Sequence, residues 1–168
     1  SGAPGDQVDP ASIDGLHALI CGITNAGVTV VAAAGNDAAD ASGYLPAAWP
    51  ETITVSAISD TDGKPGGLGG PGCLTGDPDD TFSSFSNDGP AIAIAAPGEC
   101  LLSTDIQNGY AYGSGTSFAT PLVAGVAAVY ASRDRSATPA SIRAKLLATA
   151  EPGPIPGDDD GYQEGVLR

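Results

Sequence analysis

The sequence of 168 residues has no methionine, a single histidine, a single tryptophan and only 6 basic side chains. Its 20 acidic side chains give a formal net charge of −14 at pH 7. Proteins that bind nucleic acid need lysine and arginine to displace counterions from phosphates, so this balance argues against such a function. Acidic surfaces are common on secreted soluble proteins, and solubility alone explains the sign of the charge.

Long apolar segments and zinc-binding patterns are also missing. No apolar run approaches the roughly 20 residues that a helix needs to cross a bilayer. The sequence has no Cys-x-x-Cys pattern and no His-Cys cluster of the kind that indicates zinc. A signal peptide is not recognisable, but a mature chain would lack one in any case, so the compartment stays open.

The residues that are abundant indicate one folded domain. Apolar residues make up 42% of the chain and charged residues only 15%, a composition typical of a protein with a packed core. A length of 168 residues is sufficient for one such domain. The 24 glycines and 14 prolines indicate many turns and loops.

The three cysteines fall in two kinds of context. Cys21 lies in an apolar helical pattern, which predicts a buried free thiol. Cys73 and Cys100 lie in loop-like segments rich in glycine and proline. The sequence leaves open whether these two form a disulfide or remain free thiols.

Apolar periodicity predicts alternating helices and strands. Asp9 and Pro10 give a helix cap followed by proline at the first helical position, and a stop signal follows at 25–27. Strands are predicted at 28–34, 52–58 and 91–96, and further helices at 117–132 and 139–150. Residues 60–80 form a long loop, either ordered or floppy, and the tail from 151 is also loop. This order predicts an α/β layer architecture with parallel strands, in which ligands bind beyond the carboxyl ends of the strands.

Two polar side chains occupy positions suited to chemistry. Ser117 opens an apolar helix, so backbone N–H groups and the positive helix end favour an oxyanion beside it. Asn36 follows a buried strand at its carboxyl end. A simpler interpretation is also available for each residue, since serine often caps a helix and asparagine often occupies a turn.

Four stretches in order resemble the subtilisin-like serine proteases, and together they cover nearly the whole chain. They are residues 32–36 (Ala-Ala-Ala-Gly-Asn), 45–50 (Leu-Pro-Ala-Ala-Trp-Pro), 82–98 and 115–125. The resemblance implies a parallel-sheet layered, subtilisin-like α/β fold. It also implies that residues 1–168 are the carboxyl-terminal portion of a single catalytic domain.

The resemblance implies roles for individual residues. Ser117 matches the nucleophile and Asn36 the side-chain donor of the oxyanion hole. Ala33, Ala34 and Gly35 would form one wall of the pocket that takes the substrate side chain. The bond before Pro46 corresponds to a position where the family often has a cis proline.

The catalytic aspartate and histidine of this family do not match any residue of the chain. His17 is the only histidine and lies inside the first predicted helix, so we interpret it as a helix-surface or core residue. In this family both partners precede the oxyanion asparagine. Leu122 departs from the family pattern too, because histidine usually follows the proline there.

Two functional hypotheses follow from the resemblance. In the first, the chain is the carboxyl-terminal half of a secreted endopeptidase that acts on polypeptides, and an amino-terminal fragment of the same protease supplies aspartate and histidine. The chain alone would then be inactive. In the second, the chain is a non-catalytic interaction module that kept the fold and lost the catalytic partners.

The resemblance implies no required cofactor, although structural calcium is common in the family. The acidic run at 158–160 is a candidate calcium ligand set, but it lacks the other spaced ligands and fits a solvated turn better. If the chain stands alone, its few strands leave one apolar sheet edge uncovered.

Overall fold

Three parallel strands form the centre of the molecule. The computed structural model describes residues 10–167. Strand β2 (Thr52–Ser59) lies between β1 (Val30–Ala33) and β4 (Ile94–Pro97) and pairs with both in parallel. The short strand β3 (Thr81–Phe82) pairs antiparallel with the end of β2. All eight residues of β2 are buried, and its faces differ: Ile53, Val55 and Ala57 share one face, whereas Thr52, Thr54 and Ser56 lie on the other.

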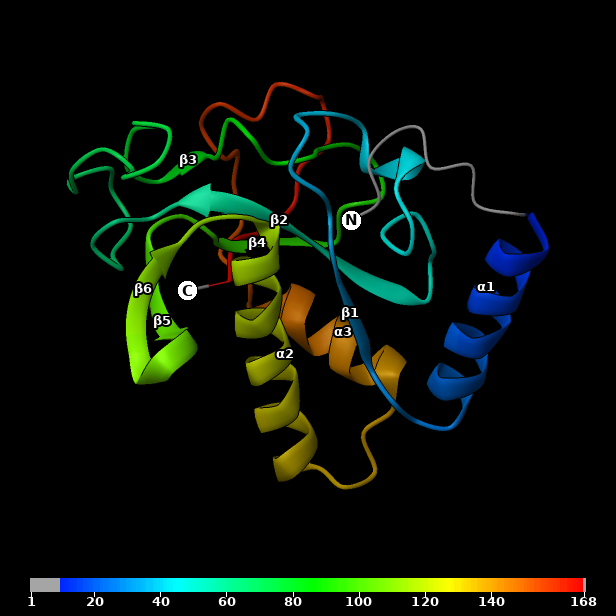
Figure 1. Cartoon of the computed structure of the whole chain (residues 1–168). Helices are drawn as coiled ribbons and strands as arrows, with labels where there is room; N and C mark the ends of the chain where they lie inside the picture. The colour runs from blue at the N-terminus through cyan, green and yellow to red at the C-terminus, as the bar shows by residue number, and fades with distance from the viewer. Residues whose placement is uncertain (1–9, 168) are drawn as a thin grey trace.

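Two helices cover one face of this sheet (Figure 1). Helix α2 (Thr116–Arg133) and helix α3 (Pro139–Thr149) pack on the face that Ile53, Val55 and Ala57 present. Thr138 caps α3 with its side chain and Pro139 follows, as the sequence predicts. The α/β architecture with parallel pairing is therefore confirmed.

The carboxyl-terminal segment covers the opposite face. Its residues Ile155 and Val166 pack against Ile58, Phe82 and Ala95. The side chain of Glu164 is 8% exposed and accepts a hydrogen bond of 2.6 Å from the Ser56 hydroxyl in β2. The tail predicted as loop is thus an integral layer of the fold, held by apolar contacts, by the buried hydrogen bond to Ser56 and by backbone hydrogen bonds that join Ala95 to Gly165 and Leu167.

The sequence analysis did not predict one β-hairpin. Strands β5 (Leu101–Asp105) and β6 (Gly109–Gly113) pair antiparallel, and a short 3-10 helix, η2 (Ile106–Asn108), joins them. Most of their residues are exposed, so the segment lacks the alternation of apolar and polar side chains that reveals a half-buried strand. A second 3-10 helix, η1 (Ala41–Gly43), was not predicted either. The strand predicted at 91–96 begins only at Ile94, because a turn closed by the Ile92 N–H and the Gly89 carbonyl precedes it.

Helix α1 (Pro10–Asn25) stands to one side of the sheet (Figure 1). Ile20 is 7% exposed, whereas Leu16, Leu19 and Ile23 are 46%, 67% and 43% exposed.

Among the described strands, β1 pairs only with β2, so one edge of the sheet is open, as expected. The predicted cap at Asp9 and the loop at residues 1–5 lie outside the described residues. No helix in the described part of the chain has the length and apolarity needed to span a bilayer.

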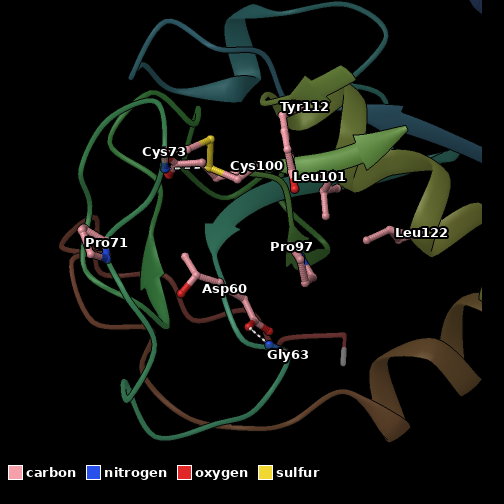
Figure 2. Close-up of a pocket in the computed structure, with 11 residues that line it drawn as sticks. Asp60, Gly63, Pro71, Cys73, Pro97, Cys100, Leu101, Tyr112 and Leu122 are labelled. Carbon is pink, nitrogen blue, oxygen red and sulfur yellow. Dashed lines mark hydrogen bonds between the residues drawn. A yellow bond between two sulfur atoms is a disulfide. The ribbon is translucent and has the colours of Figure 1, made fainter. Parts of the chain in front are cut away.

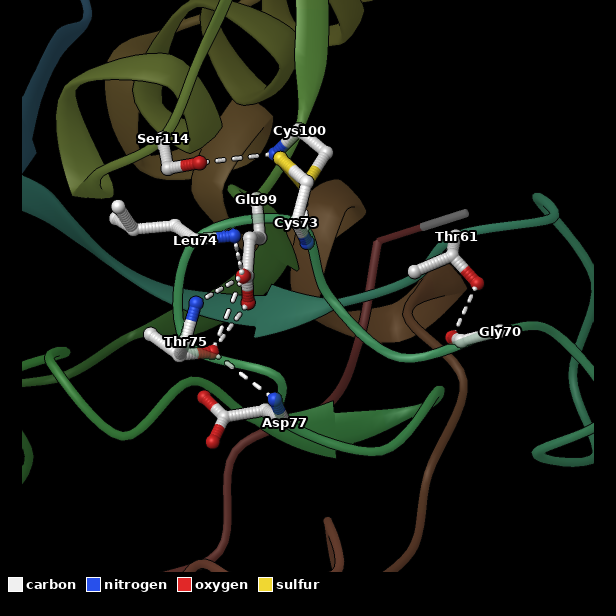
Figure 3. The surroundings of a disulfide bond; sticks show 9 residues. All are labelled: Thr61, Gly70, Cys73, Leu74, Thr75, Asp77, Glu99, Cys100 and Ser114. Carbon is white, nitrogen blue, oxygen red and sulfur yellow. Dashed lines mark hydrogen bonds between the residues drawn. A yellow bond between two sulfur atoms is a disulfide. The ribbon is translucent and has the colours of Figure 1, made fainter.

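The long loop at 60–80 is ordered. A disulfide joins Cys73 to Cys100, with their Cα atoms 5.7 Å apart. The buried carboxylate of Glu99 accepts hydrogen bonds of 2.9 Å from the N–H groups of Leu74 and Thr75 (Figure 3). Cys21 is the free thiol, and it is half-buried rather than fully buried as predicted, because α1 packs on few neighbours.

Carboxyl groups gather where the carboxyl-terminal segment meets the sheet. Asp160 accepts hydrogen bonds from the N–H groups of Gly89 and Tyr162. Burial, together with the charges of Glu164 and Asp160, raises the pKa of Asp158 to about 7. Burial also raises the pKa of Glu164. Between about pH 4 and pH 7 the folded chain therefore binds protons that the unfolded chain releases, so folding stability falls as the pH rises through this range.

We expect the substitution Asp158→Asn to raise the melting temperature at pH 8 by a few degrees and to have little effect at pH 4. At pH 8 the substitution removes a crowded negative charge, whereas at pH 4 the carboxyl group is already neutral. Thermal unfolding followed by circular dichroism at both pH values measures this. The exposed neighbour Asp159 provides the control substitution Asp159→Asn. An equal shift for Asp158→Asn at both pH values would contradict the prediction.

Candidate functional site

All five residues predicted for the site line one cavity of about 140 Å³. The cavity lies where the carboxyl end of β1 meets the amino-terminal end of α2. Ser117 and Asn36 are both exposed, and 80 residues of chain separate them. The remaining residues of the lining are Val31, Ala32, Ala33, Ala34, Gly35, Tyr44, Leu45, Pro46 and Thr116. The fold therefore brings the alcohol and the amide to a shared cavity. The peptide bond between Leu45 and Pro46 is cis, as the resemblance implied.

Hydrogen bonds from Thr116 fix the orientation of the Asn36 amide. The Thr116 N–H donates to Asn36 Oδ1 at 2.8 Å, and the Thr116 hydroxyl lies 3.0 Å from the same oxygen. An N–H group can donate only to the carbonyl oxygen of an amide, so Oδ1 must face Thr116. The Nδ2 group of Asn36 is then turned away from Thr116. An amide held in this way presents N–H donors without exchanging protons.

Asn87 holds the backbone on both sides of Asn36. Its side chain is fully buried and accepts hydrogen bonds from the N–H groups of Asp37 and Ala39 at 2.9 and 3.2 Å. Its Nδ2 group donates to the Ala34 carbonyl at 2.9 Å. The turn that carries Asn36 is therefore anchored to the segment after β3.

Gly35 is required by this arrangement. Its φ of +112° lies in the region that side chains rarely adopt, and a Cβ there would overlap the side chain of Asn87. The Gly35 N–H also donates to the Thr116 hydroxyl at 3.2 Å. Glycine thus lets β1, the Asn87 side chain and the start of α2 meet at one point.

The start of α2 is suited to binding a developing negative charge. Ser117 is the second residue of the helix, so its N–H has no carbonyl partner four residues back within α2. The helix dipole adds positive potential at this end. A donor from Ser117 and a donor from Asn36 at one cavity are the elements of an oxyanion-binding site.

The side chain of His17 contacts Glu51 and Trp49, outside the cavity. Its Nε2 atom lies 3.0 Å from Glu51 Oε2, and its ring stacks on Trp49 with the ring centroids 4.7 Å apart. It does not line the cavity that Ser117 and Asn36 share. Within the described residues, the lining of that cavity contains no histidine, aspartate or glutamate that would act as a base toward Ser117.

A larger cavity, of about 490 Å³, lies beside the disulfide (Figure 2). Leu122 of α2 and Tyr112 of β6 face it from one side, and Asp60 and Gly63 from the other. Neither Ser117 nor Asn36 lines it. Cavity size and the convergence of the two predicted polar groups therefore point to different cavities. The departure from the family pattern at Leu122 lies in this second cavity.

Sequence reasoning missed the two residues that orient Asn36. Thr116 lies inside the stretch that identified Ser117, and Asn87 lies inside the stretch at 82–98. Each was therefore noted as part of a motif without a role. Only the fold shows that these side chains reach across to the Asn36 turn, because the contacts span 80 and 50 residues.

Comparisons with known proteins agree with the fold. The profile of the subtilase family matches residues 2–165. Alkaline serine exoprotease A of Vibrio alginolyticus is 34% identical over 91% of this chain, and thermitase of Thermoactinomyces vulgaris is 39% identical over 82% of it. These matches cover 26% and 42% of the two relatives.

A solved structure is similar as well. It is described as a cold-adapted subtilisin-like serine proteinase, and it superposes with a TM-score of 0.77 at 32% identity. The match covers 92% of this chain and 50% of that protein. The chain therefore spans about half the length of this solved relative, and less than half the length of each of the two named proteases. By these similarities the chain belongs to the subtilase family.

Proposed function

We propose that the chain is the carboxyl-terminal portion of a single catalytic domain of a secreted serine endopeptidase. The observation that carries this proposal is the shared cavity of Asn36 and Ser117, at the junction of a strand end and a helix start. In this role Ser117 is the nucleophile, Asn36 is the side-chain donor of the oxyanion hole, and polypeptides are the substrates.

The reaction would proceed in two steps. The Ser117 hydroxyl loses its proton to a general base and attacks the substrate carbonyl, while Asn36 Nδ2 and the Ser117 N–H donate to the oxyanion. Return of the proton to the leaving amine breaks the peptide bond and leaves an acyl-enzyme on Ser117. Water then releases the acid product and restores the serine. Ala33, Ala34 and Gly35 form the wall beside the substrate side chain, and their small size leaves room for an apolar group.

The amino-terminal portion of the same protease would supply the aspartate and the histidine. Two features support this partner: the open edge of β1, and the exposed apolar side chains of Leu16, Leu19 and Ile23 on α1. Large exposed apolar patches mark surfaces that bury against another element. The relatives matched by this chain are about two to four times as long as the matched segment, which leaves room for such a portion. On this proposal the isolated chain is inactive.

An extracellular location fits the chemistry of the chain. The Cys73–Cys100 disulfide is of a kind that persists in oxidising compartments. One relative, 37% identical over 83% of this chain, is named an extracellular serine proteinase of a Thermus strain. Hydrolysis of this type needs only side chains and water, so we propose no required cofactor, and structural calcium stays a prediction.

The substitution Ser117→Ala is expected to abolish peptide hydrolysis by the assembled protease without changing its melting temperature by more than a degree or two. The hydroxyl is exposed, so its loss removes the nucleophile but no core contact. Release of a chromophore from a peptide substrate measures the activity. Ser132→Ala, at the far end of the same helix, is the matched control and should keep full activity. Persisting hydrolysis in Ser117→Ala would refute the assigned nucleophile.

Removal of the side-chain donor should lower kcat rather than weaken substrate binding. We expect Asn36→Ala and Asn36→Asp each to reduce kcat by about 10²–10³-fold, the size of loss known for the side-chain donor of subtilisin, with little change in KM. The aspartate variant keeps an acceptor for the Thr116 N–H and so preserves the turn, but it also adds a negative charge that repels the oxyanion; the alanine variant removes the donor without adding that charge. Steady-state kinetics on the assembled protease provide the measurement. A kcat within threefold of the unmodified protein in both variants would rule out the oxyanion role.

A labelled fluorophosphonate separates the catalytic hypothesis from that of a non-catalytic module. The reagent needs an activated serine, so it should modify Ser117 in the assembled protease and leave the isolated chain unmodified. Peptide mapping by mass spectrometry identifies the labelled residue. Failure of the assembled protein to react, with no hydrolysis, would instead support a non-catalytic interaction module.

A further inference from the structure

Three different ligand atoms converge between α1 and the residue that precedes β2, and none of the three residues lines the cavity that holds Ser117. His17, Cys21 and Glu51 each offer one nitrogen, sulfur or oxygen atom, and these atoms all lie within 4.8 Å of one another. The His17 Nε2 atom is 3.0 Å from Glu51 Oε2, and the Cys21 Sγ atom is 3.5 Å from Glu51 Oε1. All three side chains are half-buried.

The fold explains why these residues meet. His17 and Cys21 are four residues apart on α1, so they lie on the same face one turn apart. Glu51 comes immediately before β2 and reaches that face from the other side. The sequence shows the pair on the helix but not the carboxylate, which is 30 residues further along the chain. Sequence reasoning therefore found no zinc pattern.

The separations fit a tetrahedral ion. Bonds of about 2.0–2.3 Å from zinc to nitrogen, oxygen and sulfur place the ligand atoms roughly 3.3–3.7 Å apart. The 3.0 Å separation joins His17 Nε2 to Glu51 Oε2, the 3.5 Å separation joins Cys21 Sγ to Glu51 Oε1, and one ligand atom of each residue lies within 4.8 Å of the other two. Rotation of the carboxylate and of the other two side chains would bring one atom of each residue to the separations that zinc requires.

The surroundings of the three side chains favour a fixed site. The ring of His17 stacks on Trp49 with an angle of 13° between the planes, which restricts rotation of the imidazole. Cys73 and Cys100 are joined to each other, so Cys21 is the one thiol among the three cysteines of the chain. The side chains of His17 and Glu51 are 38% and 27% exposed, which leaves a path for an ion and a water molecule.

We propose that His17, Cys21 and Glu51 bind one Zn²⁺ ion, with water as the fourth ligand. Nitrogen, sulfur and carboxylate oxygen together suit zinc and exclude the all-oxygen coordination that calcium prefers. Binding replaces the thiol proton of Cys21 by the metal and releases that proton to solvent. The His17 imidazole binds in its neutral form, so the ion takes the place of its present contact with Glu51.

The bound ion would connect two segments that flank the catalytic cavity. Helix α1 is followed along the chain by β1, which ends at Ala33, three residues before Asn36. The segment from 44 to 51 contributes Tyr44, Leu45 and Pro46 to the cavity wall. Zinc at Glu51 would therefore stabilise the strand end and the wall against one another. This inference does not depend on the proposed peptidase activity, because binding and stability report it directly.

Zinc titration by calorimetry tests the site on the chelator-treated chain. We expect one Zn²⁺ per chain and an increase in melting temperature with zinc concentration. Cys21→Ser and His17→Gln should each weaken binding at least about tenfold and remove the thermal shift. Asp62→Asn is the matched control, since it removes a carboxylate from the other metal-capable group, Asp60, Asp62 and Asp79, and should leave binding unchanged.

Two local readouts show where the ion binds. Zinc should protect Cys21 from alkylation by iodoacetamide, as measured by mass spectrometry. Co²⁺ should produce the absorption of a thiolate ligand and quench the fluorescence of Trp49, the only tryptophan, through the adjacent His17. Unchanged zinc affinity in both Cys21→Ser and His17→Gln would overturn the proposal, as would Cys21 alkylated equally fast with zinc. Either result would leave His17 and Glu51 as a hydrogen-bonded pair only.

Discussion

The contact between Asn36 and Thr116 is the interaction on which the site depends. It joins the carboxyl end of β1 to the first residue of α2 through two short hydrogen bonds to one amide oxygen. A parallel strand and a helix start both direct polar groups toward the same edge of an α/β sheet. The contact fixes how far apart these two elements lie, and therefore where Ser117 stands relative to Asn36. Gly35 and Asn87 serve the same contact, because they set the direction of the turn between the strand and the amide.

The sequence predicts the parts of this structure that local patterns encode. The buried strand β2, the capped helix α3 and the five residues around the cavity follow from apolar runs, capping signals and motif order. The hairpin of β5 and β6 does not follow, because both faces of its strands are exposed and no alternation marks them. The functions of Thr116 and Asn87 are equally hidden, since a side chain that bonds across 80 or 50 residues leaves no local pattern. The layer formed by the carboxyl-terminal tail depends on scattered residues such as Ile155 and Val166.

The acidic composition has a structural cause beyond solubility. Several carboxylates of the loops accept hydrogen bonds from backbone N–H groups, where regular secondary structure supplies no carbonyl partner. Glu99 binds Leu74 and Thr75, and Asp80 binds Gly66 and Gly67 at 2.6 and 2.8 Å. A basic partner is not needed when the backbone itself supplies the donors. Glu51 differs from these carboxylates, because its Oε2 atom lies 3.0 Å from a side-chain nitrogen, His17 Nε2.

The open edge of β1 has a direct consequence for the site. Parallel strands of one sheet end at the same edge, so a strand added beside β1 would carry its final residues to the edge where Asn36 lies. An aspartate or a histidine delivered in this way approaches Ser117 from the side that no described strand now occupies. On the proposed function, the described segment carries the donors for an oxyanion, and strands added beyond the β1 edge would carry the proton-transfer groups. The catalytic groups would then be divided along the chain, because each would come from the end of a different element.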